Sequence, residues 1–360
     1  MLTQSSSFAI ASLALALTVN GCTPARNGPA ADPQPAGAAV PATADSTSSL
    51  QLREKAAAVL VAVASVQTTD ATNPADNALR ANAIEGLLPM PGRLEPILRS
   101  ALTDKSIGIR SIAAMAAGKA KVRALVESLQ PLTTDESRLV RAAAVFGLQR
   151  NGAAADPNIL ASMLASDSAQ ERALAAFILG ELGNKSAVPM LLAASAAPAS
   201  RTGAVPDKLM RLQIAEALLK LGKGEAIDEV RAALYPSRSE DIEATALAVQ
   251  ILGQVRDSGS RAQLRNLSSD RYDSGNPMPV EIRLACAASL ARMGDQYAVS
   301  LADGFVNDKS PAIRAQAAAV YGETRDAKYL TTLSTLLSDT DKQVRISAAA
   351  AIVKITDAPR

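Results

Sequence analysis

The chain repeats itself along most of its length. The heptapeptide DKSIGIR begins at Asp104, and the nearly identical DKSPAIR begins at Asp308. Related segments begin at a register arginine in eight places, and a ninth begins at a threonine: Arg80, Arg110, Arg141, Arg172, Arg211, Thr245, Arg283, Arg314 and Arg345. The commonest spacing is that between Arg110 and Arg141, about 31 residues, and longer spacings coincide with turn-rich insertions near 201, 235 and 270. Such a period predicts a repeat architecture and excludes most compact single-core folds.

Each unit contains two helical patterns. Apolar or small residues lie one residue before the register arginine and three, four and seven residues after it, as in Val140, Ala144, Val145 and Leu148. This spacing predicts a helix with one apolar face, and a shorter helical segment such as YLTTLSTLL follows. Neither helix can bury its apolar face alone, so successive pairs must stack. The sequence therefore predicts an all-α fold, an α-solenoid.

Four units share the pattern Asp-x5-Arg-x2-Ala-Ala and resemble the short bacterial form of the HEAT repeat. The matching pairs are Asp104 and Arg110, Asp135 and Arg141, Asp308 and Arg314, and Asp339 and Arg345. The resemblance implies a right-handed α-solenoid of about nine helix-pair repeats over residues 50–360. It also implies a structural ladder in which these aspartates and arginines join neighbouring repeats. An arginine row that grips an anionic partner is the alternative.

The first fifty residues predict export and a tether. Phe8–Val19 is an apolar run too short to span a bilayer, and VNGC follows it, ending at Cys22. This resembles a bacterial lipoprotein signal and implies a signal peptide at 1–21 and lipidation of Cys22. Ordinary secretion and a retained segment are the alternatives. Residues 22–49 are rich in Pro, Ala, Gly and Ser and predict a disordered tether. Because Thr23 rather than an acidic residue follows Cys22, the resemblance implies the outer membrane, facing the periplasm.

The composition argues against several kinds of site. The chain has no histidine, which removes the commonest general base and metal ligand. A net charge of +2 gives no reason to expect a nucleic-acid partner. Cys286 takes a position where other repeats have alanine, so we expect it to be buried rather than nucleophilic. We expect no catalytic residues, no metal site and no cofactor, although oxygen-rich DRYDSGN, which begins at Asp270, leaves a structural ion open.

One strip of residues suggests a binding surface. Positions 2 and 5 after the register residue face away from the predicted core, and they are apolar in a set of units: Ile112, Met115, Phe146, Leu174, Phe177 and Leu247. Lys119, Arg150 and Glu181 would rim this strip. An apolar groove with a charged rim is typical of a site for a helix or an extended peptide. The alternative is that tight curvature buries these side chains against the next repeat.

The sequence thus predicts a membrane-tethered, HEAT-like scaffold or adaptor that binds proteins in the bacterial cell envelope. A structural subunit that binds an envelope polymer through the loops near Arg201 and Asp270, with Tyr272 as a stacking ring, is a second interpretation. An enzyme of the bilin-lyase kind, implied only by resemblance, is a third interpretation.

Overall fold

The computed structural model describes residues 46–66, 73–197, 203–235, 241–269, 278–297 and 299–357. In these residues all regular secondary structure is helical. The predicted signal peptide, nearly all of the tether, and Cys22 lie outside the described residues. So do 198–202, 236–240 and 270–277, which fall within the three predicted insertions and include Arg201, Asp270 and Tyr272.

Within the described residues, nine long helices form the inner layer, one for each register residue. They are α2 (Pro74–Gly86), α4 (Ile107–Lys119), α6 (Arg138–Arg150), α8 (Ala169–Leu182), α10 (Ala204–Lys220), α12 (Ile242–Gln254), α14 (Val280–Arg292), α15 (Pro311–Thr324) and α17 (Lys342–Thr356). Each packs against the next along the chain, which confirms the predicted α-solenoid.

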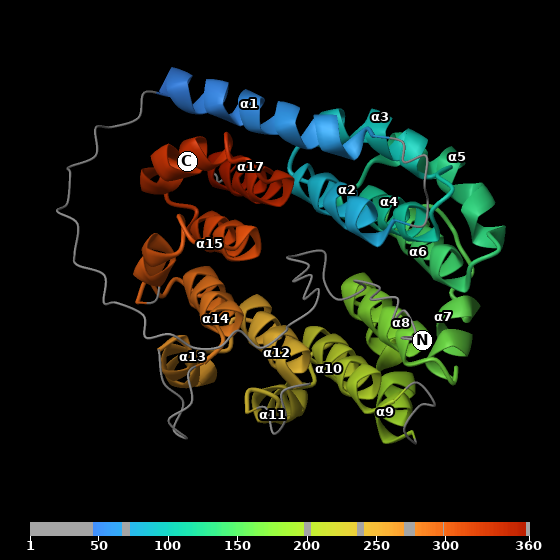
Figure 1. The fold of residues 1–360 in the computed structure, drawn as a ribbon. Helices are drawn as coiled ribbons and strands as arrows, with labels where there is room; N and C mark the ends of the chain where they lie inside the picture. Colours follow the sequence, from blue (N-terminus) through green and yellow to red (C-terminus); the bar gives the residue numbers. More distant parts are fainter. Residues whose placement is uncertain are drawn as a thin grey trace, which may run out of the picture.

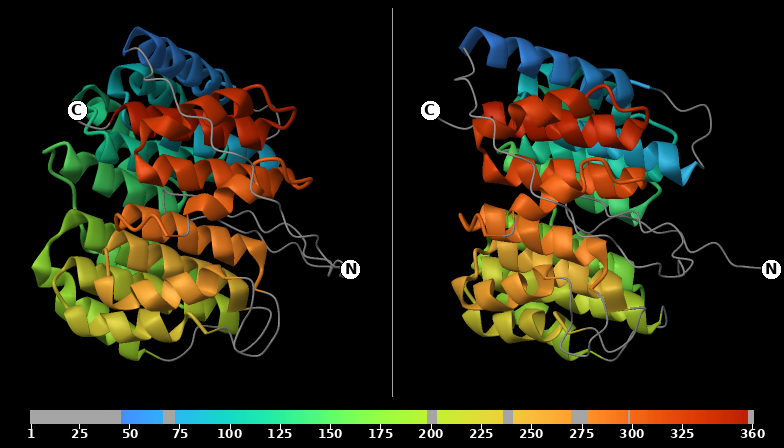
Figure 2. Two further views of the ribbon diagram at one scale, coloured as in Figure 1. Left: turned by 90° about the vertical axis from the view of Figure 1, so that its left-hand side faces the viewer. Right: turned by 60° about the vertical axis from the view of Figure 1, so that its left-hand side comes forward.

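Shorter helices form the outer layer and return the chain to the start of the next inner helix. They are α3 (Pro91–Ala101), α5 (Val126–Leu129), α7 (Asn158–Leu164), α9 (Val188–Ala196), α11 (Ile227–Ala232), α13 (Arg261–Ser268) and α16 (Leu330–Leu336), several of them preceded by a 3-10 turn. Between α14 and α15 the 3-10 helix η7 (Val299–Gly304) takes this role. Because the chain returns each time, the nine inner helices run in the same direction, and Figure 2 shows their axes roughly aligned.

Small residues let the inner helices approach one another closely. A Cβ added at Gly322 in α15 would lie 2.9 Å from both Cα and Cβ of Ala351 in α17. Gly180 stands in the same relation to Ala217, and an added Cβ would lie 2.8 Å from the Ala217 Cα. Such short backbone-to-backbone spacing brings the inner layer together more tightly than larger side chains would allow, and it contributes to the curvature of the stack.

The curved stack closes into a ring (Figure 1). The first helix, α1 (Ser46–Ala64), packs against α17 and α2, and α17 also packs directly against α2. Gly86 of α2 meets Ala350 of α17 and Leu60 of α1, so the closing contact uses the same glycine packing as the other junctions. An ion pair of 2.8 Å between Arg53 and Asp357 joins the two ends.

The helical part of the chain begins slightly before residue 50, where the predicted solenoid starts: α1 is a 19-residue helix that begins at Ser46. Its buried face, which includes Ala56, Leu60 and Ala64, completes the core between the first and last repeats rather than shielding an open end. Closure was not anticipated from the sequence, since the pairing of α1 with α17 joins residues more than 300 positions apart.

Candidate functional site

The aspartate–arginine pairs lie at the end of the ring where the inner helices begin. Arg110 donates from Nε and Nη2 to the carboxylate of Asp135 at 2.8 and 3.1 Å. Arg314 contacts Asp339 in the same way, at 2.9 and 2.8 Å. Each arginine therefore reaches the aspartate of the following repeat. These contacts hold the pKa of Asp339 below its ordinary value and, against the opposing effect of burial, do the same for Asp135.

Other members of the predicted ladder have different partners. Asp104 pairs with Arg80 of the preceding repeat. Asp308 accepts a hydrogen bond from the backbone N–H of Ser310 at 2.7 Å and so shapes its own turn. Arg141 and Arg345 donate to backbone carbonyls of the turns that precede them, and neither forms an ion pair within the described residues. The buried pair of Arg172 and Asp207, at 3.5 Å, extends the ladder beyond the predicted residues.

The predicted apolar strip is not an open groove. Met115, Leu174, Phe177 and Leu247 are 3 to 5 % exposed, and Phe146 is completely buried. Ile112 is half-buried. The reason is the close approach of the inner helices: a Cβ on Gly118 would lie 2.7 Å from the ring of Phe146, so this ring lies against the backbone of the preceding repeat. The alternative interpretation of the strip, burial by tight curvature, is the one that agrees with the structure.

Charged residues occupy one position in nearly every repeat, nine residues after the register residue. We call this set the charged belt: Lys119, Arg150, Glu181, Lys220, Arg292, Glu323 and Lys354. They lie at the C-terminal ends of parallel inner helices and therefore at one end of the ring. Lys119 of α4 and Lys220 of α10 both lie over the ring of Phe177 in α8, at 5.1 and 5.2 Å from its centroid. Because α6 separates α4 from α8 along the chain, Lys119 reaches Phe177 past that helix.

Ion pairs within the charged belt join neighbouring inner helices. Glu323 bridges Arg292 at 2.5 Å and Lys354 at 2.6 Å, and it thereby connects α14, α15 and α17. Burial acts to raise the pKa of Glu323, but these two cations bring it below its ordinary value. Lys220 contacts both Glu181, at 2.5 Å, and Glu216, at 2.7 Å.

Three residues of the charged belt, Lys119, Arg150 and Glu181, were predicted as a rim of the strip. The other four, Lys220, Arg292, Glu323 and Lys354, were not predicted as part of a site, although the same position is charged in their repeats. Reading position 9 across all repeats, rather than only beside the apolar residues, would have found them.

A second feature of this end of the ring is a set of strained basic residues, which we call the basic rim: Lys121, Arg256 and Arg325. They occupy position 11 after the register residue, in the turn that follows each inner helix, and their φ angles are 52°, 54° and 55°. Four other repeats place glycine there, for example Gly152 and Gly183. The left-handed conformation costs a residue with a side chain about 1–2 kcal/mol. All three basic side chains are exposed, and none has an ion-pair partner among the described residues.

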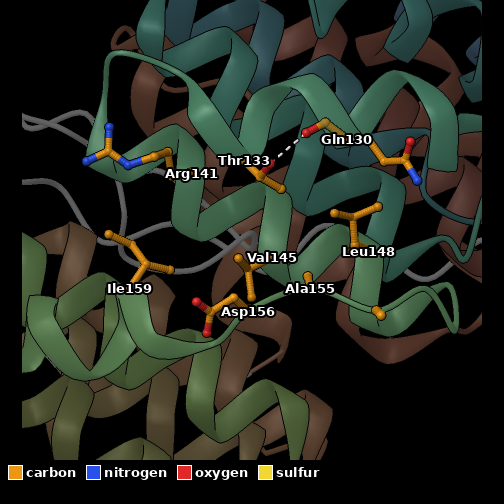
Figure 3. A pocket seen from close by; sticks show the side chains of 9 residues that line it. Gln130, Thr133, Arg141, Val145, Leu148, Ala155, Asp156 and Ile159 are labelled. Carbon is orange, nitrogen blue, oxygen red and sulfur yellow. Dashed lines mark hydrogen bonds between the residues drawn. The ribbon is translucent and has the colours of Figure 1, made fainter.

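Two clefts open at junctions between repeats on the side of the outer helices. The larger has a volume of about 450 Å³ and is lined by Gln130, Thr133, Arg141, Val145, Leu148, Ala154, Ala155, Asp156 and Ile159 (Figure 3). The smaller, of about 220 Å³, includes another register arginine, Arg211, and Glu229. Burial raises the pKa of Glu229, and Arg211 opposes this effect.

Cys286 is completely buried in α14, and burial raises the pKa of its thiol. This position agrees with its interpretation as a small packing residue. Among the described residues no cluster of acidic or cysteine side chains has the arrangement of a metal site. In the same part of the chain, no helix combines the length and apolarity needed to cross a membrane.

Comparison with known proteins supports the repeat assignment. Residues 275–353 match the family model described as HEAT repeats. No curated protein matches the chain in sequence. The paired-helix stack over these residues agrees with the match, which covers less than a quarter of the chain.

Three solved structures are similar to the chain at low scores. The CpcE–CpcF complex of phycocyanin lyase from Nostoc sp. PCC7120 has a TM-score of 0.38 and 20% identity, over 72% of this chain and 94% of that chain. An engineered protein has a TM-score of 0.33 and 17% identity, over 87% and 96%. Human deoxyhypusine hydroxylase has a TM-score of 0.32 and 14% identity, over 85% and 98%.

Proposed function

We propose that this ring of HEAT repeats is a non-catalytic scaffold or adaptor that binds acidic protein surfaces at the end of the ring bearing the charged belt. The basic rim is the observation that carries the proposal. Lys121, Arg256 and Arg325 adopt a backbone conformation that glycine would adopt without strain, yet their side chains are exposed and unpaired within the described residues. No packing or ion pair within the described residues compensates the free-energy cost of this backbone conformation. Contacts with a partner bound at the rim would offset that cost.

The arrangement of charge supports an acidic partner. Arg150 of the charged belt is exposed at the same end of the ring as the basic rim. Exposed cations in a ring accelerate association with a surface of opposite charge and fix its orientation. Both acidic residues of the belt, by contrast, are paired internally, Glu181 with Lys220 and Glu323 with Arg292 and Lys354.

The rim can be tested without weakening the fold. In the full-length chain, Lys121→Gly, Arg256→Gly and Arg325→Gly together remove three charges and relieve the left-handed strain. We expect this variant to be at least as stable as the parent chain and to lose its partners in crosslinking and co-purification from intact cells. The matched control replaces exposed lysines at the opposite end of the ring, Lys105→Ala, Lys309→Ala and Lys342→Ala, and should retain them. Equal recovery of partners with both variants would refute the rim as the binding surface.

We further propose that the ring is tethered to the bacterial cell envelope by lipidated Cys22, at the outer membrane and facing the periplasm. The VNGC segment after an apolar run supports this address, and the predicted tether of residues 22–49 would connect the anchor to the ring, overlapping the start of α1 at Ser46. In cells that produce lipoproteins, the parent chain should incorporate a labelled fatty acid and sediment with outer membranes. Cys22→Ala should abolish the label. A Cys22→Ala chain that remained in the outer membrane fraction with an unchanged mass would show that the tether is not lipid.

A further inference from the structure

The junction between α6 and α8 contains half of a ladder contact. In a complete contact, Nη1 of the arginine donates to two carbonyls of its own turn while Nε and Nη2 donate to the next aspartate. Arg314, for example, contacts the carbonyl oxygens of Asp308 and Lys309 at 2.8 and 3.3 Å and the carboxylate of Asp339. Arg141 makes the first set, to Asp135 and Glu136 carbonyls at 2.6 and 3.2 Å. Its Nε and Nη2 donate to no described residue.

Ser166 occupies the position in this repeat where a complete ladder contact has its aspartate. Asp339 Oδ1 accepts a hydrogen bond from the backbone N–H two residues later, at 2.9 Å, while its carboxylate also receives the arginine. Ser166 Oγ accepts the equivalent bond from the N–H of Ser168, at 3.2 Å. Serine thus shapes the turn as aspartate does elsewhere, but it is too short and carries no charge to pair with Arg141.

The larger cleft runs along α6, between residues 130–133 on one side and the start of α7 on the other, and Arg141 lines it. Figure 3 shows Arg141 and Ile159 toward one side of the cleft and Gln130 and Leu148 toward the other. Val145, Leu148 and Ile159 provide an apolar wall, and Asp156 adds a carboxylate whose Oδ1 accepts from the N–H of Asn158 at 3.0 Å. A volume of about 450 Å³ lies within the range of small-molecule sites, about 300–1,000 Å³.

We propose that this cleft binds a monocarboxylate attached to a branched apolar group, with the ligand carboxylate taking the place of the absent ladder aspartate on Arg141. A guanidinium held by two carbonyls presents its remaining N–H groups in the fork geometry that a carboxylate matches. The apolar wall would take the branched group, and Asp156 disfavours ligands with several negative charges while accepting an N–H next to the carboxylate. An N-acylated apolar amino acid has these features. It occurs both as a free acid and as the C-terminal residue of a peptide.

The first experiment compares probes that differ only at the carboxylate. N-acetyl-leucine and a pentapeptide ending in leucine are titrated by calorimetry into the full chain, alongside the corresponding C-terminal amides. We expect saturable binding of the acids, at least tenfold tighter than that of the amides and weaker at high salt, because a charge-assisted hydrogen bond is lost in the amide. Tighter binding of the pentapeptide would assign the site to peptide C-termini, and tighter binding of the small acid to a free metabolite. Equal binding of acid and amide, or no binding of either acid, overturns the proposal.

The second experiment introduces a carboxylate of the chain itself next to Arg141. Ser166→Asp restores the ladder aspartate, so it should raise the melting temperature and reduce acid binding at least tenfold. Ser166→Asn has nearly the same volume without the charge, and it should leave the preference for acid over amide intact. Arg141→Gln provides an independent variant, which should abolish that preference. If Ser166→Asp bound the acid as tightly as the parent chain does, Arg141 would not be the receiving group. These outcomes are independent of the proposed partner-binding rim, because neither of the substituted residues, Arg141 and Ser166, belongs to that rim.

Discussion

At the scale of single residues, the end of the ring with the charged belt contains a carboxyl group with a strongly raised pKa. Glu85 of α2 is half-buried, and burial raises its pKa from 4.5 to about 8, with Lys119 opposing the shift. Lys119 in turn has a lowered pKa, first because of burial. Neither residue forms an ion pair within 4 Å among the described residues. In the folded chain the Glu85 carboxyl group therefore stays protonated over a pH range in which the same group is already ionised in the unfolded chain.

This difference gives the stability of the ring a specific pH dependence. Stabilisation from protonated Glu85 is complete below pH 4.5 and is lost as the pH rises toward about 8, because only the unfolded state ionises freely in that window. Each unit of raised pKa corresponds to about 1.4 kcal/mol. Glu85→Gln keeps the size and removes the titration, so its urea midpoint should fall less than that of the parent chain between pH 5 and 8. Parallel curves for the two chains would contradict the raised pKa.

At the scale of helices, the sequence predicted which segments pair but not how closely. The register arginines located all eight of the inner helices that carry one, since an arginine and its apolar neighbours recur at a fixed spacing. The same sequence suggested that Phe146 and Phe177 were accessible, because a helical period shows which face a residue occupies and not what covers that face. The covering elements are Gly118, which brings a neighbouring backbone onto Phe146, and Lys119 and Lys220 over Phe177.

Glycine at the helix crossings should therefore control the stability of the stack. Gly322→Ala places a Cβ 2.9 Å from the backbone of Ala351, which cannot yield as a side-chain tip can. We expect a loss of about 1–3 kcal/mol in the free energy of unfolding, measured by urea denaturation. Gly92→Ala is the matched control, since its Cβ would meet nothing within 4 Å in α3. It should be neutral or stabilise by up to about 1 kcal/mol. Equal effects of the two substitutions on the free energy of unfolding would show that the short distance between the inner helices does not determine the stability of the stack.

At the scale of the whole molecule, closure changes the energetics of a repeat protein. In an open solenoid the terminal repeats have one neighbour and unfold first. In this ring α17 contacts α2 directly, and α1 packs across both. Gly86 in the first repeat is consistent with this arrangement, since the first repeat of an open solenoid would not need a glycine to bring another helix close. The sequence alone does not show which helix approaches, because Gly86 contacts Ala350, 264 positions away.

Opening the ring at α1 should expose its former ends selectively. Leu60 is completely buried and contacts Gly86, so Leu60→Asp places a charge in the closing contact and should release α1 from α2 and α17. Hydrogen exchange is then expected to accelerate at least tenfold in α2 and α17, while α8 and α10, which keep both neighbours, change little. Leu192→Asp on the exposed face of α9 provides the control and should leave exchange unaltered everywhere. In the parent chain, α2 and α17 should be as protected as α8. Two results would show that closure does not stabilise the terminal repeats in this way. One is hydrogen exchange that is faster in α2 and α17 than in α8 of the parent chain. The other is an equal acceleration of exchange in all nine inner helices of the Leu60→Asp variant.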